Sequence, residues 1–303
     1  MAEITPPQDG TPDLASADLP SAKVMHPLRK MAGMFFSNIN AVVGLILLTA
    51  ILLFTFVGPL LHVVDPFEMV WAPFARPGEE GFLFGTDYLG RDILSAMMAG
   101  GQVSMAIGLA AAVISLIIGV TVGAFAGYYG GWIEEALMRF TEFFQVLPTL
   151  LFSMVIVALF GASLLTVTLA IGVVSWTAVA RVTRGEFLRI REMEYVAAAR
   201  SGSARDGYLI FRVILPNALP PIIVQANLMV GSAILFEAAL SFLGLSDPNV
   251  MSWGQVIGSN RPYILDAGFA VAIPGMAIFL TVLAISLIGD GLNDALNPKL
   301  RQR

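Results

Sequence analysis

Long apolar runs, separated by short polar segments, dominate the chain. Residues 39–61, 93–133 and 143–180 contain no charged residue. About 20 apolar residues are enough for a helix to cross roughly 30 Å of hydrocarbon. The third run is divided by the turn-like Gly161-Ala162-Ser163 and is short for two spans, so its first helix is expected to begin near Glu135. The pattern predicts six spans, at about 39–61, 103–129, 135–160, 164–182, 215–243 and 268–289.

Composition supports a membrane protein. Hydrophobic residues make up 57% of the chain and charged residues 13%, whereas a soluble domain carries about 25% charge. We therefore expect an all-α polytopic membrane protein. The chain has no cysteine and two histidines, which excludes disulfides, thiolate metal sites and a histidine-rich metal site.

Charge in the connections predicts the orientation. The outer loop, residues 62–101, has six acidic residues against two arginines, whereas residues 181–214 have seven arginines against four acidic residues. Basic residues also flank the six spans at both ends: Lys23, Arg29 and Lys30, then Lys299, Arg301 and Arg303. Both termini are therefore expected in the cytoplasm. Residues 1–22 are polar and proline-rich and predict a disordered cytoplasmic tail, and 23–38 an interfacial segment.

The chain lacks the common nucleotide-binding and hydrolase motifs. A P-loop needs a lysine after glycine and before serine or threonine, and Lys23, Lys30 and Lys299 lack that context. No G-x-S-x-G or G-x-G-x-x-G pattern occurs. We expect no catalytic residues, no metal site and no bound cofactor, and nothing indicates a nucleic-acid partner. If transport is driven by ATP, another subunit must hydrolyse it.

The cytoplasmic loop 184–214 is too patterned for a simple linker. Glu194–Arg200 favours a short helix, Ser201-Gly202-Ser203 breaks it, and 206–214 can form a second helix before Pro216. Small alanines on such a helix allow close approach of a partner surface. The loop therefore predicts a helix–turn–helix that a soluble motor domain could grip.

This segment resembles the EAA loop of bacterial ABC importer permeases. Counting back without gaps from Leu215-Pro216 places Ala198 and Ala199 on the two alanines of that motif, Ala197 on its glutamate and Ser203 on its glycine. We call residues 194–216 the coupling segment. The residues to which the resemblance assigns contact with an ATPase are Glu194, Tyr195, Ala197, Ala198, Ala199, Arg200, Gly202, Ser203, Leu215 and Pro216.

Further motifs resemble the C-type permease of dipeptide, oligopeptide and nickel importers. Residues 84–92, Phe-Gly-Thr-Asp-Tyr-Leu-Gly-Arg-Asp, are similar to its G-T-D-x-x-G-R-D signature. Residues 126–132, 237–245, 252–254 and 289–298 also match, so that the resemblance runs from about residue 30 to 303. The outer-loop signature comprises Gly85, Asp87, Gly90, Arg91 and Asp92, which we expect to tie the loop to itself or to a partner subunit.

The resemblance implies a type I ABC importer permease of the bacterial inner membrane. It further implies a heterodimer with a second permease, two cytoplasmic ATPase subunits that bind ATP and magnesium, and an extracytoplasmic binding protein. Transport would proceed by alternating access. The implied cargo is di- or oligopeptides, with nickel, glutathione, opines or short saccharides as variations on the same architecture.

Two features leave alternatives open. Glu237 is the one acidic residue well inside a span, and a structural role is favoured over contact with substrate in a translocation path. Gly119, Gly123 and Gly127 are spaced for close helix packing within this subunit, which is favoured over a moving gate. The rival functions are an ion-coupled or passive carrier without an ATPase, for which the spans offer only Glu237, and an integral membrane enzyme.

Overall fold

The computed structural model describes residues 27–296. The predicted tail 1–22, residues 23–26 and the basic residues 299, 301 and 303 lie outside this range. The helices are α1 (Pro27–Ser37), α2 (Ile39–Phe56), α3 (Gly58–Leu61), α4 (Ile93–Tyr129), α5 (Gly131–Val146), α6 (Thr149–Phe160), α7 (Leu164–Val174), α8 (Thr177–Arg191), α9 (Glu194–Ser201), α10 (Asp206–Tyr208), α11 (Leu215–Phe242), α12 (Trp253–Asn260) and α13 (Phe269–Leu296). Short 3₁₀ turns lie at Glu79–Gly81 and Arg261–Tyr263, and a π-helical turn at Leu209–Ile214.

The described residues confirm an all-α membrane protein. Their only strand-like features are two isolated bridges in the outer loop. Within the same range, five helical segments are long and apolar enough to cross a membrane: 39–56, 93–129, 164–191, 206–242 and 269–296. The pair α5 and α6 supplies a sixth candidate, which is bent by 84°.

Two helices differ from the sequence prediction, one in where it begins and the other in being broken. The helix of the second span begins at Ile93 rather than near 103, because Asp92 caps the helix by accepting hydrogen bonds from the backbone N–H groups of Leu94 and Ser95. The third span was predicted as one helix over 135–160 but breaks at Leu147 and Pro148. Leu147 is extended, with ψ 128°, because the ring of a following proline disfavours helical backbone at the residue before it.

The other predicted spans lie close to observed helices but end differently. The fourth was expected to end at 182, yet α8 follows α7 after a break at Ser175 and Trp176 and continues to Arg191. The last was expected to end at 289 and continues to Leu296. Helices therefore extend beyond the apolar windows that a bilayer requires.

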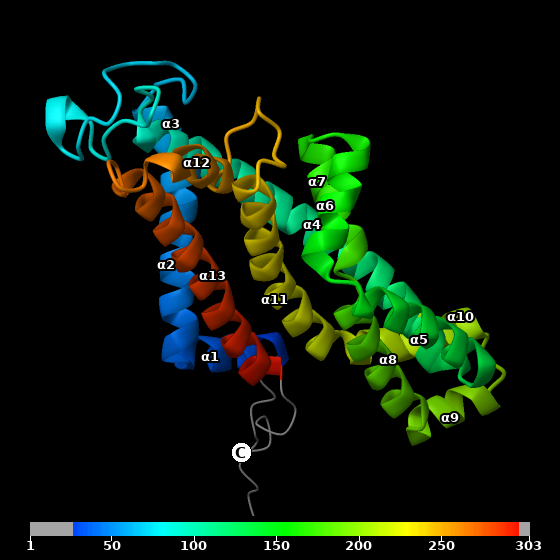
Figure 1. The fold of residues 1–303 in the computed structure, drawn as a ribbon. Helices are drawn as coiled ribbons and strands as arrows, with labels where there is room; N and C mark the ends of the chain where they lie inside the picture. The colour runs from blue at the N-terminus through cyan, green and yellow to red at the C-terminus, as the bar shows by residue number, and fades with distance from the viewer. Residues whose placement is uncertain (1–26, 297–303) are drawn as a thin grey trace, which may run out of the picture.

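The molecule has two ends, joined by the diagonal α4 (Figure 1). At 37 residues α4 is about 55 Å long, well beyond the roughly 30 Å of a hydrocarbon core. The outer loop, α3 and α12 lie at one end, which we call the outer-loop end. The helices α1, α5, α9 and α10 and the end of α13 lie at the other, which we call the coupling end (Figure 1).

The glycine row on α4 packs against α8. A Cβ on Gly119 would lie 2.5 Å from the Val179 Cβ, and one on Gly123 would lie 2.3 Å from the Ala180 carbonyl oxygen. A Cβ on Gly127 would meet Phe187 at 2.6 Å. These glycines therefore let two helices of this subunit approach closely, and they fix α8 beneath the coupling segment.

Candidate functional site

The short helix α9 of the coupling segment presents small side chains to solvent. Ala197 and Ala198 are exposed and Ala199 is half-buried. Tyr195 is 45% exposed, and the flanking Glu194 and Arg200 are exposed as well. The site residues of α9 thus form a solvent-exposed surface on which Ala197 and Ala198 are accessible.

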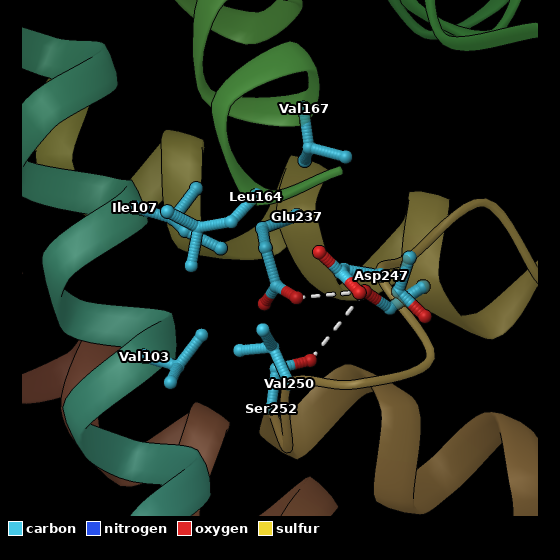
Figure 2. A pocket seen from close by; sticks show the side chains of 10 residues that line it. Val103, Ile107, Leu164, Val167, Glu237, Asp247, Val250 and Ser252 are labelled. Carbon is cyan, nitrogen blue, oxygen red and sulfur yellow. Dashed lines mark hydrogen bonds between the residues drawn. The ribbon is translucent and has the colours of Figure 1, made fainter. Parts of the chain in front are cut away.

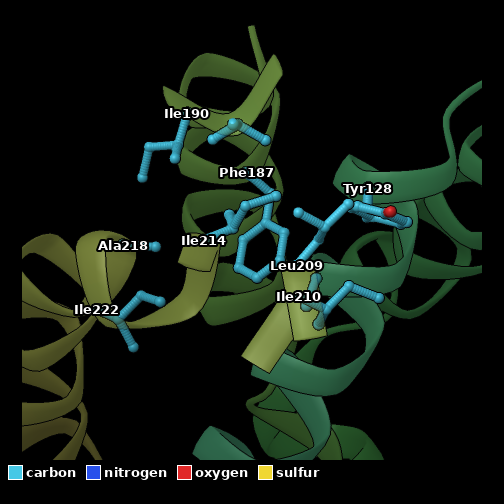
Figure 3. Close-up of a cluster of buried hydrophobic side chains, with 10 residues drawn as sticks. Tyr128, Phe187, Ile190, Leu209, Ile210, Ile214, Ala218 and Ile222 are labelled. Carbon is cyan, nitrogen blue, oxygen red and sulfur yellow. The ribbon is translucent and has the colours of Figure 1, made fainter. Parts of the chain in front are cut away.

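The opposite face of the segment stands on a buried apolar cluster (Figure 3). Val196 from α9 and Leu209 and Ile214 from the π-helical turn are 0% exposed, and they pack with Phe187 of α8. The same cluster continues through Ile190, Ile210, Ala218 and Ile222 to α11. The coupling segment is therefore rigidly joined to α4, α8 and α11 rather than suspended as a free loop.

The turn between α9 and α10 places Ser203 in an unusual conformation. Ser203 has φ +61°, in the left-handed region that favours glycine. Gly202, one residue earlier, has φ −75° and does not need to be glycine. This backbone supports the gapless comparison with the EAA motif, which assigns Ser203 to the glycine position.

Polar contacts attach the coupling segment, and α8 beside it, to the end of α4 and to α5. The Tyr128 hydroxyl donates a hydrogen bond of 2.7 Å to Asp206 Oδ1. Arg191 Nη1 donates to the Gly127 and Tyr128 carbonyl oxygens at 3.3 and 3.0 Å. Glu134 and Arg184 form an ion pair between α5 and α8. Asp206 of α10 is therefore bonded directly to α4, and α8 is bonded to both α4 and α5.

The residues of the outer-loop signature pack against other residues of the same loop. Gly85 and Gly90 have φ +79° and +77°, and a Cβ at either position would lie within 2.2 Å of a backbone carbonyl oxygen, that of Ala75 or Trp71. Arg91 lies over the Phe67 ring at 5.4 Å. The tight turn at these glycines folds the loop onto itself.

Asp87 organises the same turn. Its Oδ1 accepts hydrogen bonds of 2.8 Å from the backbone N–H groups of both Leu89 and Arg91. Burial raises the pKa of the Asp87 carboxyl, and the hydrogen bonds from these N–H groups act in the opposite direction. The burial and bonding of Asp87 indicate a structural carboxyl.

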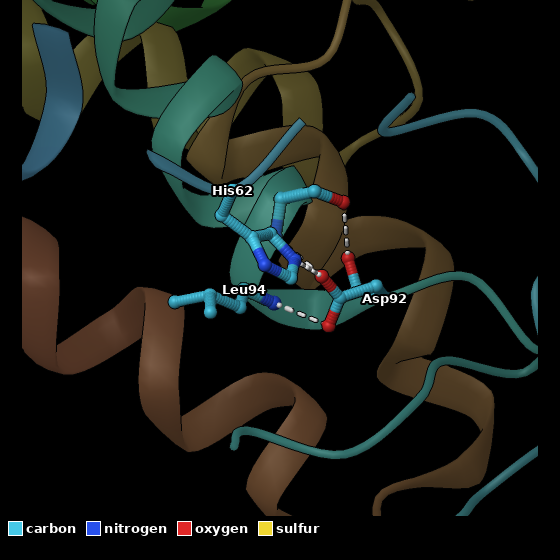
Figure 4. Close-up of polar contacts among 4 residues, drawn as sticks. His62, Asp92 and Leu94 are labelled. Atoms are coloured by element: carbon cyan, nitrogen blue, oxygen red, sulfur yellow. Dashed lines mark hydrogen bonds and ion pairs between the residues drawn. The ribbon is translucent and has the colours of Figure 1, made fainter. Parts of the chain in front are cut away.

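Asp92, the residue that caps α4, also contacts His62, the residue that directly follows α3 (Figure 4). His62 Nε2 lies 2.6 Å from Asp92 Oδ2, and the Asp92 side chain is 2% exposed. The structure brings all five signature residues together in one folded loop, far along α4 from the coupling segment.

Glu237 lies near the outer-loop end of α11 and is 1% exposed. Its carboxyl accepts hydrogen bonds from Ser104 of α4 and Ser241 of α11. Figure 2 shows it beside a small cavity that Asp247 also lines. The cavity volume is about 10 Å³, which is room for about one water molecule, so Glu237 does not face a space large enough for a substrate.

Sequence reasoning missed three contacts. Tyr128–Asp206 and His62–Asp92 join residues 78 and 30 positions apart, and only the motif at 126–132 pointed to Tyr128. The third is Trp253, which is 0% exposed and whose indole N–H donates to the Met97 carbonyl oxygen at 2.8 Å. Among the described residues, no group of three or more His, Cys, Asp or Glu side chains could hold a metal.

The sequence matches a known protein family and several named permeases. The family model "binding-protein-dependent transport system inner membrane component" matches residues 119–302. The di/tripeptide permease DppC of Pseudomonas aeruginosa is 40% identical, covering 95% of this chain and 97% of the relative. The oligopeptide permease OppC of Escherichia coli is 39% identical, covering 88% and 89%. The glutathione permease GsiD of Pectobacterium atrosepticum is also 39% identical, with 72% of each chain covered.

The fold also matches a solved transporter. A chain of the MetNI methionine ABC transporter, in an inward-facing conformation, superposes with a TM-score of 0.56. The two chains are 17% identical, and the match covers 67% of this chain and 96% of the other. The arrangement of helices is therefore that of an ABC importer permease.

Proposed function

Because this chain belongs to the family of binding-protein-dependent transport system inner membrane components, we propose that it is the permease through which a peptide importer moves its cargo. Members of this family are multi-pass inner-membrane permeases, and the ATPase is a separate chain. The chain is thus not an enzyme, and its importer includes ATPase and binding-protein partners.

We propose that the ATPase binds the coupling segment. The observation that carries this proposal is the exposed alanine face of α9, which is backed by the buried cluster around Phe187. Exposed alanines let a partner surface approach the backbone, and the cluster makes the segment stiff enough to move the spans. One ATPase would bind this segment, and a second would bind its counterpart in a second permease. ATP binding would then move the helices between outward-open and inward-open states.

The proposed orientation places the coupling end in the cytoplasm. The basic segment 181–214 and the end of α13 lie at that end, whereas the acidic outer loop lies at the other (Figure 1). This distribution follows the positive-inside rule. In this orientation both termini are cytoplasmic, and the binding protein would dock on the outer loop and α12.

The proposed cargo is di- or oligopeptides. The support is the printed function of the relatives that cover most of this chain, the di/tripeptide and oligopeptide permeases. The glutathione permease, itself a carrier of a small peptide, is equally similar over a shorter stretch.

Replacing Ala198 by arginine tests the coupling role. The side chain would stand in the contact surface that the exposed alanine leaves open, so uptake by the assembled importer should fall to background. Membrane insertion should be unchanged, because nothing buried is altered. Uptake of a labelled dipeptide and the amount of ATPase that co-purifies are the measurements.

The matched control is Ala32→Arg in α1, which lies at the same end of the molecule and is also exposed. We expect this variant to transport normally. Normal uptake and normal ATPase co-purification in Ala198→Arg would contradict the coupling role, as would equal loss in both variants.

A further inference from the structure

The short helix α12 lies against α4 and α11 at the outer-loop end (Figure 1). Its contact with both helices includes close approaches of backbone, and the Trp253 indole N–H also donates to the Met97 carbonyl oxygen of α4 at 2.8 Å. A Cβ on Gly254 would lie 2.6 Å from the Ala238 Cα, and one on Gly100 would lie 3.1 Å from the Trp253 backbone nitrogen. Because these backbones are so close, a small displacement of α12 toward α4 or α11 would produce a steric clash. Specific hydrogen bonds hold α12 in this position.

A buried chain of hydrogen bonds centred on Glu237 also holds α12, and Figure 2 draws the part of it that runs between Glu237 and Ser252. The Trp253 backbone N–H donates to Ser104 Oγ at 3.2 Å, and Ser104 Oγ donates to Glu237 Oε2 at 3.1 Å. On the other side, Ser241 Oγ donates to Glu237 Oε1 at 2.7 Å. Ser252, the residue that caps α12, contacts the Ser241 hydroxyl at 3.5 Å.

We propose that Glu237 is a positioning residue that latches α12 to α4 and α11 through Ser104 and Ser241. Each carboxyl oxygen serves one branch of the network, and the two branches reach the first residue of α12 and its cap. The latch lies at the opposite end of α4 from the coupling segment, and it does not depend on the proposed function of that segment.

Two substitutions at position 237 distinguish the loss of hydrogen bonds from the loss of side-chain volume. Alanine at 237 removes both acceptors and leaves the Ser104 and Ser241 hydroxyls without them in a buried site, which is costly. Glutamine has the same shape and can accept from one serine and donate to the other, because a hydroxyl both donates and accepts. A latch made of hydrogen bonds should therefore tolerate Glu237→Gln and fail with Glu237→Ala.

The absence of cysteine allows a direct test in the assembled importer. A single cysteine replaces Val256 of α12, which is 4% exposed and packs with Ala96 and Met251. Its reaction rate with a maleimide is measured in permeabilised membranes, where the reagent reaches both faces. We expect Glu237→Ala to raise this rate by at least about tenfold and Glu237→Gln to leave it within about twofold.

Two reference cysteines identify general unfolding. Ala75, 8% exposed in the outer loop, should stay unreactive as Ala75→Cys, and Leu265, 96% exposed, should react in every background as Leu265→Cys. If Glu237→Ala also exposes position 75, the test is repeated with Ser104→Ala. This variant removes only one branch of the network and should raise labelling at position 256 alone. An unchanged labelling rate at position 256 in both Glu237→Ala and Ser104→Ala would contradict the latch. Equal labelling rates in Glu237→Gln and Glu237→Ala would contradict it as well.

Discussion

The two motif-bearing regions at the ends of α4 use their residues in opposite ways. In the outer loop, Thr86, Asp87 and Asp92 are at most 8% exposed, and their polar atoms are bonded within the subunit. In the coupling segment, Ala197, Ala198 and Arg200 point to solvent, and only the reverse face is buried. A motif in a membrane permease can therefore mark either a fold that must be kept or a surface that awaits a partner.

The difference follows from residue type. Glycine, aspartate and threonine build tight turns, since they tolerate unusual backbone or bond to it, and the outer loop uses them for that purpose. Alanine favours a helix, but it has no side-chain bond to make and little to bury, so the exposed alanines of α9 add little to its packing against the rest of the subunit. The largest effects of substitution should therefore come from beneath the coupling segment and within the outer loop.

Phe187→Ala should give the largest effect. Phe187 is 0% exposed beneath α9, and phenylalanine-to-alanine changes in cores cost about 3–5 kcal/mol. Trypsin should cleave the variant importer much faster at Arg200, Arg205 and Arg212, the exposed arginines of the segment. Phe211→Ala is the matched control, because Phe211 is 60% exposed in the neighbouring turn. Equal cleavage rates would mean that the cluster does not support the segment.

Gly90→Ala should come next, at the other end of the molecule. Left-handed backbone costs alanine about 1–2 kcal/mol, and its Cβ would also lie 1.9 Å from the Trp71 carbonyl oxygen. Gly78→Ala isolates the backbone cost, because Gly78 has φ +83° and no atom within 4 Å of a Cβ. The thermal unfolding midpoint of the purified importer should fall further for Gly90→Ala. The same fall in both variants would remove the argument for close packing in the outer loop.

Tyr128→Phe should have an intermediate effect. It removes the hydroxyl that donates to Asp206, a loss of about 1 kcal/mol. We expect uptake per ATP hydrolysed to fall by up to about fivefold, because the segment then moves more independently of α4. Tyr129→Phe is the control, since the Tyr129 ring is 44% exposed. A ratio unchanged by Tyr128→Phe would show that this bond does not join the segment to α4.

Ser203→Gly should give the smallest effect, in the stabilising direction. Glycine accepts φ +61° without strain, and the gain is reduced by the greater freedom of glycine in the unfolded chain, leaving about 0.5–1 kcal/mol. Trypsin cleavage at Arg205 should become slower, whereas Gly202→Ala should change it little. Faster cleavage in Ser203→Gly would contradict the assignment of residue 203 to the glycine position.

Much of the fold was predictable because lipid imposes simple requirements on sequence. Uncharged runs predicted an all-α membrane protein, and the motifs predicted the family; both were confirmed. The predicted span 103–129 lies within α4, and the earlier start of the helix at Ile93 had its own signal in the sequence. Asp92 followed by an apolar run is a helix N-terminus, but 103–129 is the most apolar window. Hydropathy finds the part of a helix that lies in lipid, not the whole helix.

The break at Pro148 and the buried contacts were harder to predict. Proline occurs within the continuous helices α11 and α13 as well, at Pro220, Pro221 and Pro274, so its presence alone does not indicate an 84° bend. The role of Glu237 was left open because its partner Ser104, and Trp253 that donates to Ser104, belong to other elements. Such contacts depend on which helices become neighbours, and no local pattern in the sequence encodes that.

The break at Pro148 also determines how the protein meets its lipid surroundings. Helix α6 has 12 residues and is therefore about 18 Å long, against a hydrocarbon thickness of about 30 Å. Its exposed side chains, among them Leu159 and Phe160, are apolar, so nothing in α6 itself makes up the difference. Where α6 faces lipid rather than a partner subunit, the bilayer beside it should become thinner, and thinning has an elastic cost. Lipids with short acyl chains should therefore suit this permease better than lipids with long ones.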